Sequence, residues 1–333
     1  MSEPIRIAIT FKLSPEHVRQ IEAVDPRIRV VDFPVEVLRP DLSVPEEERA
    51  RAKQALAEVD VIFGPNSIPP EFVDAAPGLK WFQVINAGVD RMAEQGLLGR
   101  DFVVTNVSGL AAVPIAEYVI GTMLMLCKGL HTSVRDQLEH KWNFRFTAEL
   151  KGQTIGIAGM GAIGRETARR ARAFGMRVVA SRRTVAPGQV DEDCDLLLPY
   201  SELDTLLAES DYLVLCVPLT AETTGLIGAA ELAKMRPTAS IINIARGAVI
   251  DQDALIRALK DGTIAGAALD VTDPEPLPPE SELWDLPNVI ITPHISGSVE
   301  RYGTRATELF VGNLRRYVAG EALENVVDPV LAY

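Results

Sequence analysis

Short apolar segments that alternate with longer amphipathic ones constrain the fold of this chain most. The first series of these segments lies at Ile5–Thr10, Ile28–Asp32, Val59–Phe63, Trp81–Ile85 and Phe102–Thr105. A second series begins at Thr154, with TIGIAGMG, MRVVAS, DYLVLCVP, SIINIARG, IAGAALDV and NVIITPH. Runs of Val, Ile, Leu and Ala without clean polar alternation are typical of strands covered on both faces. The sequence therefore predicts an α/β protein with two doubly wound parallel sheets flanked by helices.

Composition and charge narrow the class of protein. The chain has 333 residues, which suits two domains better than one. Hydrophobic residues make up 47% and charged residues 24%, the composition of a soluble globular protein rather than a disordered one. The formal net charge is -13, and a surface this acidic repels nucleic-acid phosphates and anionic membranes. We therefore expect neither a nucleic acid nor a membrane as a partner.

The cysteines and the N-terminal segment indicate the cellular compartment of the protein. Cys127, Cys194 and Cys216 are widely spaced and include no C-x-x-C pair, which argues against a disulfide framework and against a zinc site. The N-terminal MSEPIRIAIT has no cleavage-site pattern and predicts a first strand rather than a signal peptide. The most membrane-like segment, Ile115–Leu130, contains two charged residues and predicts a buried helix. We expect a cytoplasmic protein without a metal.

The strongest local motif is GIAGMGAIGRETARRARAFG, in which Gly159, Gly161 and Gly164 form G-x-G-x-x-G between a strand and a helix. The first glycine permits a tight turn, the second lets the backbone approach a pyrophosphate, and the third allows close packing of helix and strand. The helix N-terminus then faces the anion with free N–H groups. Glycines also serve ordinary turns, but the strand–turn–helix context predicts a dinucleotide site. The residues of this glycine loop are Gly159, Met160, Gly161, Ala162, Ile163 and Gly164.

The turn after the next strand, MRVVAS, bears on the choice of dinucleotide. NAD-selective sites place an acidic residue there, about 20 residues after the glycines, to bond the ribose hydroxyls. This chain has SRRT instead, with Ser181, Arg182 and Arg183. Two guanidinium groups and a hydroxyl suit a 2'-phosphate, because arginine binds phosphate through paired charge-assisted hydrogen bonds. The alternative is a solvated basic turn. The sequence favours NADP, with NAD as the alternative cofactor.

Three charged or titratable side chains follow separate strands of the second series. Arg246 follows SIINIA, Glu275 lies in the loop after GAALDV, and His294 follows VIIT and a proline. Ligands bind beyond the carboxyl ends of the strands in doubly wound sheets, so we expect these side chains in one crevice. Reduction of a 2-oxo acid needs a group that binds the carboxylate, a proton donor, and a group that keeps the donor protonated. Arg246, His294 and Glu275 suit these three tasks in turn.

Six segments spread along the chain carry a resemblance to a known family. They are NAGVD (Asn86–Asp90), GMGAIG (Gly159–Gly164), CVPLTAETTGLI (Cys216–Ile227), INIARGAVID (Ile242–Asp251), GAALDVTDPEP (Gly266–Pro276) and TPHISG (Thr292–Gly297). With them the sequence resembles the D-isomer-specific 2-hydroxyacid dehydrogenase family, which includes glyoxylate and hydroxypyruvate reductases and phosphoglycerate dehydrogenases. The resemblance covers nearly the whole chain. It implies an oxidoreductase that transfers a hydride between NADP(H) and a small 2-oxo acid or D-2-hydroxy acid.

The resemblance also implies which residues form the site. The catalytic arginine, glutamate and histidine of the family fall on Arg246, Glu275 and His294. The loop that binds the substrate carboxylate beside the arginine falls on Asn86, Ala87 and Gly88. Contacts to the dinucleotide fall on Val217, Pro218, Thr223, Ala245, Asp270, His294 and Gly297.

The same resemblance implies a Rossmann nucleotide-binding domain, residues 108–298, inserted into a flavodoxin-like substrate-binding domain, residues 1–107 plus 299–333. It implies a homodimer that forms through the helix near Ile115–Leu130. A dinucleotide-sensing, corepressor-like binding protein without significant turnover is the alternative function, because some relatives of that kind retain the same three residues. The sequence does not reveal the side chain of the 2-oxo acid, and we expect specificity to depend on the loops around Asn66, Ser67, Asn86 and Trp142.

Overall fold

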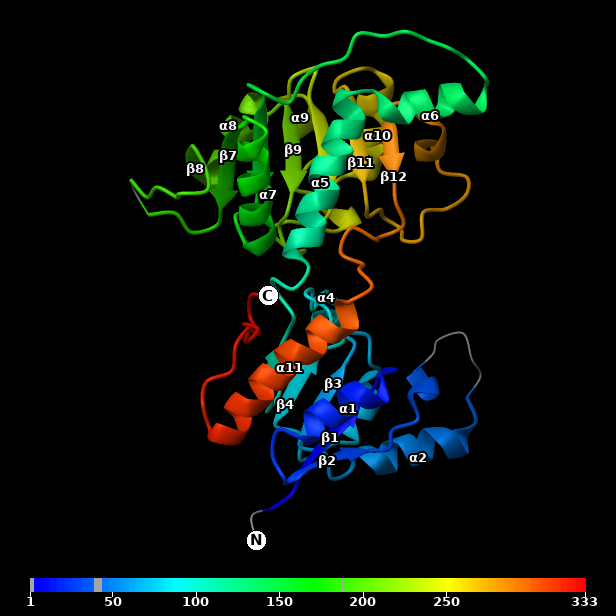
Figure 1. Ribbon diagram of the computed structural model, residues 1–333, viewed down its shortest axis with the longest axis vertical. Coiled ribbons are helices and arrows are strands. Elements are labelled where there is room, and N and C mark those ends of the chain that lie inside the picture. The colour runs from blue at the N-terminus through cyan, green and yellow to red at the C-terminus, as the bar shows by residue number, and fades with distance from the viewer. Residues whose placement is uncertain (1–2, 39–43, 187) are drawn as a thin grey trace. The chain divides into compact units, whose positions relative to one another are not determined.

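The strands form two separate parallel sheets, one of five strands and one of seven, in the computed structural model of the chain (Figure 1). The structure describes residues 3–38, 44–186 and 188–333. Contacts divide the chain into unit 1, Met1–Leu110 with Glu300–Tyr333, and unit 2, Ala111–Val299. Each unit is built around its own sheet. The prediction of an α/β fold with two parallel sheets is confirmed.

The sheet of unit 1 has the order β2-β1-β3-β4-β5, which is the order of flavodoxin-like folds. Its strands are β1 (Ile5–Ile9), β2 (Ile28–Val31), β3 (Val61–Gly64), β4 (Trp81–Val84) and β5 (Val103–Thr105). Its helices are α1 (Pro15–Glu22), the 3-10 helix η1 (Val35–Leu38), α2 (Glu46–Leu56), α3 (Pro70–Asp74), α4 (Asp90–Glu94) and α11 (Tyr302–Ala319). Successive strand residues point to opposite faces, so Ile7 packs with α1 and α11, whereas Ala8 packs with α2 and α3.

The last helix of the chain joins unit 1 through aromatic stacking and buried polar contacts. The Phe310 ring of α11 lies 4.2 Å from the Phe63 ring, centroid to centroid, in a stacked arrangement. The Asn313 amide donates to the side-chain oxygen of buried Gln83 at 3.2 Å and accepts from the Glu324 N–H at 2.8 Å. These contacts explain why a chain that leaves unit 1 before unit 2 returns to it at the end.

The sheet of unit 2 has the order β12-β11-β10-β9-β6-β7-β8. The chain adds β7 and β8 on one side of β6 and then β9 to β12 on the other, as in Rossmann folds. The strands are β6 (Thr154–Ala158), β7 (Arg177–Arg182), β8 (Leu196–Pro199), β9 (Tyr212–Leu215), β10 (Ser240–Asn243), β11 (Gly266–Leu269) and β12 (Val289–Ile291). The helices are α5 (Ala112–Cys127), α6 (Leu130–Leu138), α7 (Ala162–Ala173), η2 (Tyr200–Glu202), α8 (Leu203–Glu209), α9 (Ala229–Leu232), η3 (Gly247–Val249), α10 (Gln252–Lys260) and η4 (Glu282–Asp285).

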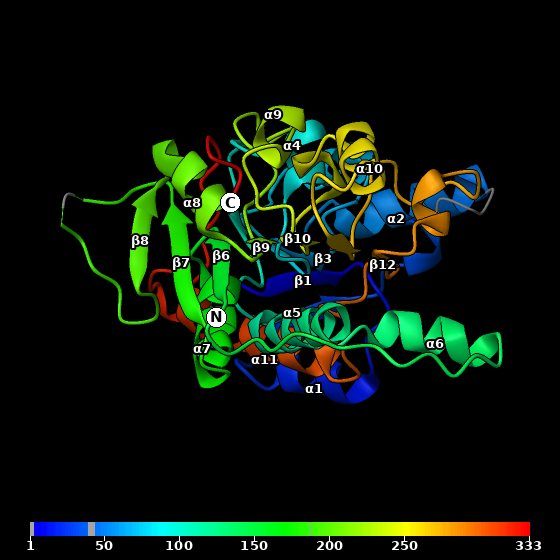
Figure 2. The ribbon, with the colours of Figure 1, turned by 90° about the horizontal axis from the view of Figure 1, so that it is seen from above.

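Helices cover both faces of the unit 2 sheet (Figure 2). α5 and α7 pack on one face with Ile155 and Ile157, whereas α8, α9 and α10 pack on the other with Leu213 and Leu215. Every residue of β6, β9, β10 and β11 is buried. Strands covered on both faces must be apolar throughout, which is why these segments lack polar alternation.

Two details of unit 2 differ from the sequence-based expectations. The edge strand β8, with the sequence LLLP, was not predicted. The buried helix expected over Ile115–Leu130 is α5, which ends at Cys127, and a second helix, α6, begins at Leu130 after Gly129, whose φ of 59° is left-handed. The pair is bent by 66°, and among the described residues no single helix is long and apolar enough to cross a membrane.

Candidate active site

The predicted site residues of unit 2 lie at one edge of its sheet. The glycine loop follows β6, Val217 follows β9, Arg246 follows β10, Glu275 follows β11, and His294 follows β12. All these strands pair in parallel, so their carboxyl ends meet at the same edge. The strand order reverses between β6 and β9, and ligands of doubly wound sheets bind at such a reversal.

Glycine occupies the three positions of the glycine loop for different physical reasons. Gly159 has a φ of 105°, and an added Cβ would lie 2.8 Å from the Cys216 carbonyl oxygen. A Cβ on Gly164 would lie 2.3 Å from the Gly159 carbonyl oxygen, so glycine lets α7 start close to β6. A Cβ on Gly161 would meet no atom of the described residues within 4 Å. The fold needs Gly159 and Gly164, whereas Gly161 leaves the backbone open to approach from outside.

The helix that follows the loop offers an anion site. α7 begins at Ala162, and Ile163 and Gly164 complete its first turn, whose N–H groups have no partner within a helix. The N–H groups of Gly159 and Met160 both donate to the Ser181 carbonyl oxygen at 3.0 Å, which fixes the loop to the end of β7. A loop open at its second glycine, in front of a helix N-terminus, fits a pyrophosphate.

The residues predicted to bind a 2'-phosphate lie at the end of β7. The Ser181 hydroxyl oxygen is buried and has no hydrogen-bond partner among the described residues. Arg182 is half-buried and donates from Nε to the Thr184 carbonyl oxygen at 3.0 Å, and Arg183 is exposed. A buried hydroxyl without a partner costs about 1–3 kcal/mol. A ligand group that bonds Ser181 would remove that cost.

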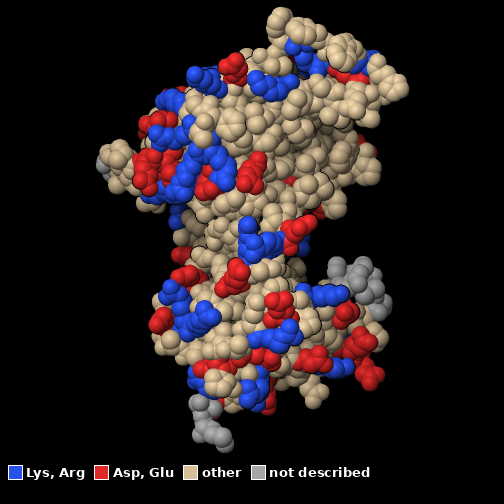
Figure 3. Space-filling view, viewed as in Figure 1, with Lys and Arg blue, Asp and Glu red and all other residues tan. Residues whose placement is uncertain are grey.

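Two buried aspartates anchor the segment before β8 to α7. Asp191 accepts from Arg165 at 2.7 and 2.8 Å, and Asp193 accepts from Arg169 at 2.8 and 3.1 Å. The aspartate side chains are only 7% and 8% exposed. Arg165 foremost, and Arg182 to a smaller extent, holds the pKa of Asp191 below its usual range. Figure 3 shows the surrounding surface of unit 2, where basic and acidic side chains are interspersed. The Arg182 charge therefore lies near a carboxylate that Arg165 already neutralises.

The loop after β9 packs against the glycine loop through Cys216. Its Thr223 hydroxyl donates to the Pro218 carbonyl oxygen at 2.6 Å and accepts from the Thr220 N–H at 2.8 Å. Val217 and Thr223 are buried. The threonine hydroxyl therefore stabilises its own loop, and a dinucleotide would contact the surface that this loop presents.

Arg246 stands at the start of η3, just beyond β10. The side chain of buried Asn243 accepts from the Ala245 N–H at 3.0 Å and donates to the Arg246 carbonyl oxygen at 2.9 Å. A Cβ on Gly247 would lie 2.0 Å from the Thr272 carbonyl oxygen. Glycine at this position therefore lets the backbone at Arg246 lie against the loop that follows β11.

His294 and Glu275 are in direct contact. Glu275 Oε1 lies 2.7 Å from His294 Nδ1, and the two side chains are 41% and 46% exposed. Pro274 and Pro276 flank the glutamate, and their rings restrict the backbone on both sides of it. His294 has a left-handed φ of 54°. Because Nδ1 is bound to the carboxylate, Nε2 is the ring nitrogen that remains for a ligand. Gly297, three residues further on, packs against the start of α5.

Asp270 holds the turn that contains His294. Its carboxylate, in a residue 1% exposed, accepts from the N–H groups of the two residues after the histidine, each at 2.9 Å. It also accepts from the Thr292 hydroxyl at 2.6 Å, and Tyr118 of α5 bonds that hydroxyl at 2.7 Å. Asp270 was predicted as a dinucleotide contact, whereas Thr292, although it begins the TPHISG segment, and Tyr118 were assigned no role. They lie 174 residues apart in the sequence, so no local motif joins them.

The predicted substrate loop lies in unit 1, after β4. Asn106 Nδ2 donates to the Ala87 carbonyl oxygen at 2.8 Å, and Asn66 Nδ2 donates to the Gly88 carbonyl oxygen at 2.9 Å. The Asn86 side chain accepts from the Asn66 N–H at 3.2 Å. Among the described residues, the N–H groups of Ala87 and Gly88 donate to no protein group. The loop is thus held through its carbonyl oxygens, and its N–H groups remain for an anion.

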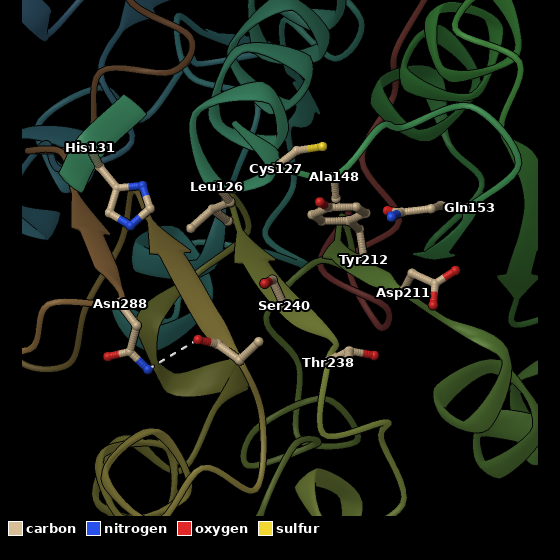
Figure 4. Close-up of a pocket in the computed structure, with 11 residues that line it drawn as sticks. Leu126, Cys127, His131, Ala148, Gln153, Asp211, Tyr212, Thr238, Ser240 and Asn288 are labelled. Carbon is tan, nitrogen blue, oxygen red and sulfur yellow. Dashed lines mark hydrogen bonds between the residues drawn. The ribbon is translucent and has the colours of Figure 1, made fainter. Parts of the chain in front are cut away.

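A cavity of about 440 Å³ lies at the opposite edge of the unit 2 sheet (Figure 4). Tyr212 and Ser240 line it where β9 and β10 begin, and Asn288 lines it just before β12. Asn288 Nδ2 donates to the Ala265 carbonyl oxygen at 3.1 Å, the dashed contact in Figure 4. These are the amino ends of the strands, whereas dinucleotides bind at the carboxyl ends. The cavity is therefore separate from the candidate active site.

The fold and the glycine loop define a dinucleotide-binding α/β protein, and comparison with known proteins gives the family. Residues 120–296 match the family described as "D-isomer specific 2-hydroxyacid dehydrogenase, NAD binding domain". The chain belongs to the D-isomer specific 2-hydroxyacid dehydrogenase family, as its motifs predicted. Members of this family are oxidoreductases with a nicotinamide dinucleotide cofactor.

Similar proteins and a solved structure support this family assignment. The chain is 37% identical over 268 residues to a glyoxylate reductase of Thermofilum pendens, covering 77% of each chain. It is 36% identical over 282 residues to glyoxylate/hydroxypyruvate reductase B of Pectobacterium carotovorum, covering 83% of this chain and 87% of that one. The crystal structure of an NADPH-dependent glyoxylate/hydroxypyruvate reductase from Sinorhizobium meliloti, in complex with NADP and sulfate, aligns over 100% of both chains with a TM-score of 0.81 and 29% identity.

Two glycine variants of this loop separate an effect on stability from an effect on dinucleotide binding. We expect Gly164→Ala to lower the melting temperature by several degrees, because its Cβ would overlap the Gly159 carbonyl oxygen. We expect Gly161→Ala to change the melting temperature little but to weaken dinucleotide binding at least tenfold, since the methyl group occupies the open approach to the backbone. Thermal unfolding and dinucleotide titration by fluorescence measure both effects. Unchanged affinity in Gly161→Ala would mean that no ligand approaches this backbone.

Proposed function

We propose that the protein is a reductase of small 2-oxo acids that uses NADPH. The contact of 2.7 Å between His294 Nδ1 and Glu275 Oε1 is the observation that carries the proposal. A histidine beside a carboxylate that stabilises its charged form suits a proton donor, and both follow strand ends where ligands bind in this fold. Relatives named glyoxylate reductase and glyoxylate/hydroxypyruvate reductase support small 2-oxo acids as the substrate class.

In this proposal, unit 2 holds the dinucleotide. The glycine loop and the N-terminus of α7 bind the pyrophosphate. The surface of Val217, Pro218 and Thr223 lines the adenosine half, and the nicotinamide half lies near Ala245, Asp270 and Gly297. When bound, the reduced nicotinamide supplies a hydride to the carbonyl carbon of the substrate.

The side chains of the site have three tasks in the reduction. Arg246 holds the substrate carboxylate in a forked pair of hydrogen bonds. In unit 1, the N–H groups of the Asn86–Gly88 loop are likewise suited to a carboxylate. As the hydride reaches the carbonyl carbon, negative charge develops on the carbonyl oxygen, and His294 Nε2 donates a proton to it. Glu275, bound at Nδ1, stabilises the imidazolium before the transfer. In the reverse direction Nε2 accepts the proton from the hydroxyl group.

Several observations favour NADPH over NADH in this chain. The end of β7 carries two arginines and a buried hydroxyl without a protein partner among the described residues, where NAD-selective sites carry a carboxylate. The nearby carboxylates of Asp191 and Asp193 are paired with Arg165 and Arg169, which reduces their effect on Arg182. The Sinorhizobium relative, which was solved with NADP, supports the same preference.

Oxidation of NADPH with glyoxylate and hydroxypyruvate as substrates tests the proposal directly. Turnover of either acid supports it. Tight dinucleotide binding without turnover of any 2-oxo acid would instead identify the second candidate, a dinucleotide-sensing binding protein.

The proton donor is tested by His294→Asn. We expect kcat to fall by about 10²- to 10⁴-fold, the usual contribution of general acid–base catalysis, while NADPH affinity changes little. His140→Asn is a matched control, because His140 has a similar φ of 55° but is exposed and lies outside the site. Steady-state kinetics and NADPH titration of both variants check this prediction. Near-normal kcat in His294→Asn would remove the histidine from the mechanism.

Cofactor choice is tested by comparing kcat/KM for NADPH and NADH. A phosphate bound by partly exposed arginines increases affinity by about tenfold to a hundredfold, so NADPH is expected to be preferred by that factor, and less so at high salt. Arg182→Asp is expected to reverse the order, because it removes an attraction and adds a repulsion. Equal use of both cofactors at low salt would show that Ser181, Arg182 and Arg183 form only a solvated turn.

We also propose a homodimer that forms through α5 and α6. None of the residues of α6 is buried within its own chain. Large apolar side chains are exposed on α6 and on the segment after it, namely Leu130, Val134, Leu138, Trp142, Phe144 and Phe146. Large exposed apolar side chains that recur along one segment in this way are typical of an association surface.

The dimer is tested by Trp142→Asp and Phe146→Asp together, two side chains that are 99% and 94% exposed. Charge at the centre of an apolar interface destabilises it, so sedimentation is expected to shift from the mass of two chains to that of one. Val330→Asp, at an equally apolar and 89% exposed position of unit 1, is the control. A wild-type chain that sediments as a monomer would contradict the proposal.

A further inference from the structure

Asp270 fixes the backbone on both sides of His294. The His294 N–H donates to the Asp270 carbonyl oxygen at 2.8 Å. The Asp270 carboxylate accepts from the N–H groups of Ile295 at Oδ1 and Ser296 at Oδ2, each at 2.9 Å. One residue therefore bonds the histidine and the two residues that follow it. His294 has a left-handed φ, which a non-glycine residue maintains only where the surroundings hold it.

The Asp270 carboxylate is in turn oriented by a hydroxyl chain. Thr292 Oγ1 donates to Asp270 Oδ1 at 2.6 Å. The Thr292 hydroxyl proton is already used in this bond. The Tyr118 hydroxyl is therefore the donor in its contact of 2.7 Å with Thr292 Oγ1. Burial raises the pKa of Tyr118 to about 12, so this hydroxyl keeps its proton near neutral pH. The chain of donors runs from α5 through Thr292 to the carboxylate.

We propose that Tyr118 and Thr292 are positioning residues, which orient His294 for proton transfer by holding the Asp270 carboxylate against the Ile295–Ser296 turn. This inference rests on the proposed function, since it assigns the purpose of the chain to the proton donor. Asp270 is 1% exposed, and from the described residues its carboxylate accepts three hydrogen bonds, all from neutral groups. A carboxylate this buried depends on those donors for its orientation.

The expected effect follows from the geometry of proton transfer. If the Thr292 donor is lost, the carboxylate keeps only the two N–H groups of the turn among the donors described, so its orientation and that of the turn after His294 are less restricted. The imidazole then shifts relative to Glu275 and to the substrate oxygen. A displacement of about 1 Å from reacting geometry can cost about 10²-fold in rate. Neither Tyr118 nor Thr292 is assigned a contact with substrate or cofactor, and Asp270 is assigned only to the nicotinamide half. The contacts proposed for the pyrophosphate and adenosine are untouched, so NADPH affinity is expected to stay close to normal.

The experiment compares Thr292→Val with Thr292→Ser in the full chain. Valine keeps the shape but removes the donor, and we expect kcat to fall about tenfold to a hundredfold while the dissociation constant for NADPH stays within about twofold. Serine keeps the hydroxyl and is expected to restore most of the turnover. Tyr118→Phe, which removes only the outer hydroxyl, is expected to lower kcat less, by about threefold to tenfold.

Thr122→Val is the matched control for loss of a buried hydroxyl. Thr122 lies on α5 and is 4% exposed, and among the described residues its hydroxyl bonds only backbone carbonyl oxygens of its own helix. We expect it to lower the melting temperature about as much as Thr292→Val does, without lowering kcat. Equal kcat in Thr292→Val and Thr122→Val would overturn the proposal, because Thr292 would then serve stability alone.

A second readout does not depend on turnover. Nitrogen-15 spectra of the four histidines, with His294→Asn to assign the signal, report the Nδ1 environment of His294. We expect the Nδ1 chemical shift of His294 to change in Thr292→Val and to stay the same in Thr292→Ser and Thr122→Val. An unchanged shift in Thr292→Val would refute the positioning role even if the protein turns over no 2-oxo acid. Absence of turnover with the expected spectra would contradict only the proposed function.

Discussion

Parallel pairing of β10, β11 and β12 is the constraint on which the candidate active site depends. Asn243 pairs with Leu269, and Leu269 pairs with Ile291, so the three strands end level with one another. Side chains that follow these ends by only a few residues are then brought to one edge. Two backbone contacts refine this arrangement: the close approach of Gly247 to the β11 loop, and the acceptance of the His294 N–H by Asp270. Hydrogen-bonded backbone thus determines where the reactive groups lie.

The fold was largely predictable because unit 2 buries both faces of its sheet. Its central strands must be apolar throughout, and such runs are visible in any sequence. The missed strand, β8, is at the edge of the sheet, where only two of its four residues are buried, so its apolar signal is short. The break between α5 and α6 was missed for the opposite reason. Apolar composition continues across Gly129, whereas the left-handed turn at that glycine ends the helix.

Residues within local motifs were predicted more readily than the residues that hold those motifs in place. The glycine loop and the three residues after the strand ends have neighbours in sequence that mark them, and their assigned roles stay predictions. The supporting contacts of Thr292 and Tyr118 join segments that lie far apart in the sequence. Asn243 bonds residues only two and three positions further on, but its side chain acts through a turn that the sequence does not reveal. The aspartates before β8 were overlooked because a run of acidic residues, DEDCD, suggests a solvated surface. In the structure these carboxylates are nearly buried, and their partners come from a helix more than twenty residues earlier.

The left-handed backbone at His294 restricts which residues this position accepts. Glycine, asparagine, aspartate and histidine are the side chains that enter this conformation with least strain, and of these only histidine combines it with a proton-donating ring. An alanine there would disturb the turn as well as remove the acid, so a survey of the site by alanine replacement would confuse backbone damage with lost chemistry. The same backbone limits which substitutions this position tolerates. Most other side chains would strain the turn, whether or not the chain needed a proton donor there.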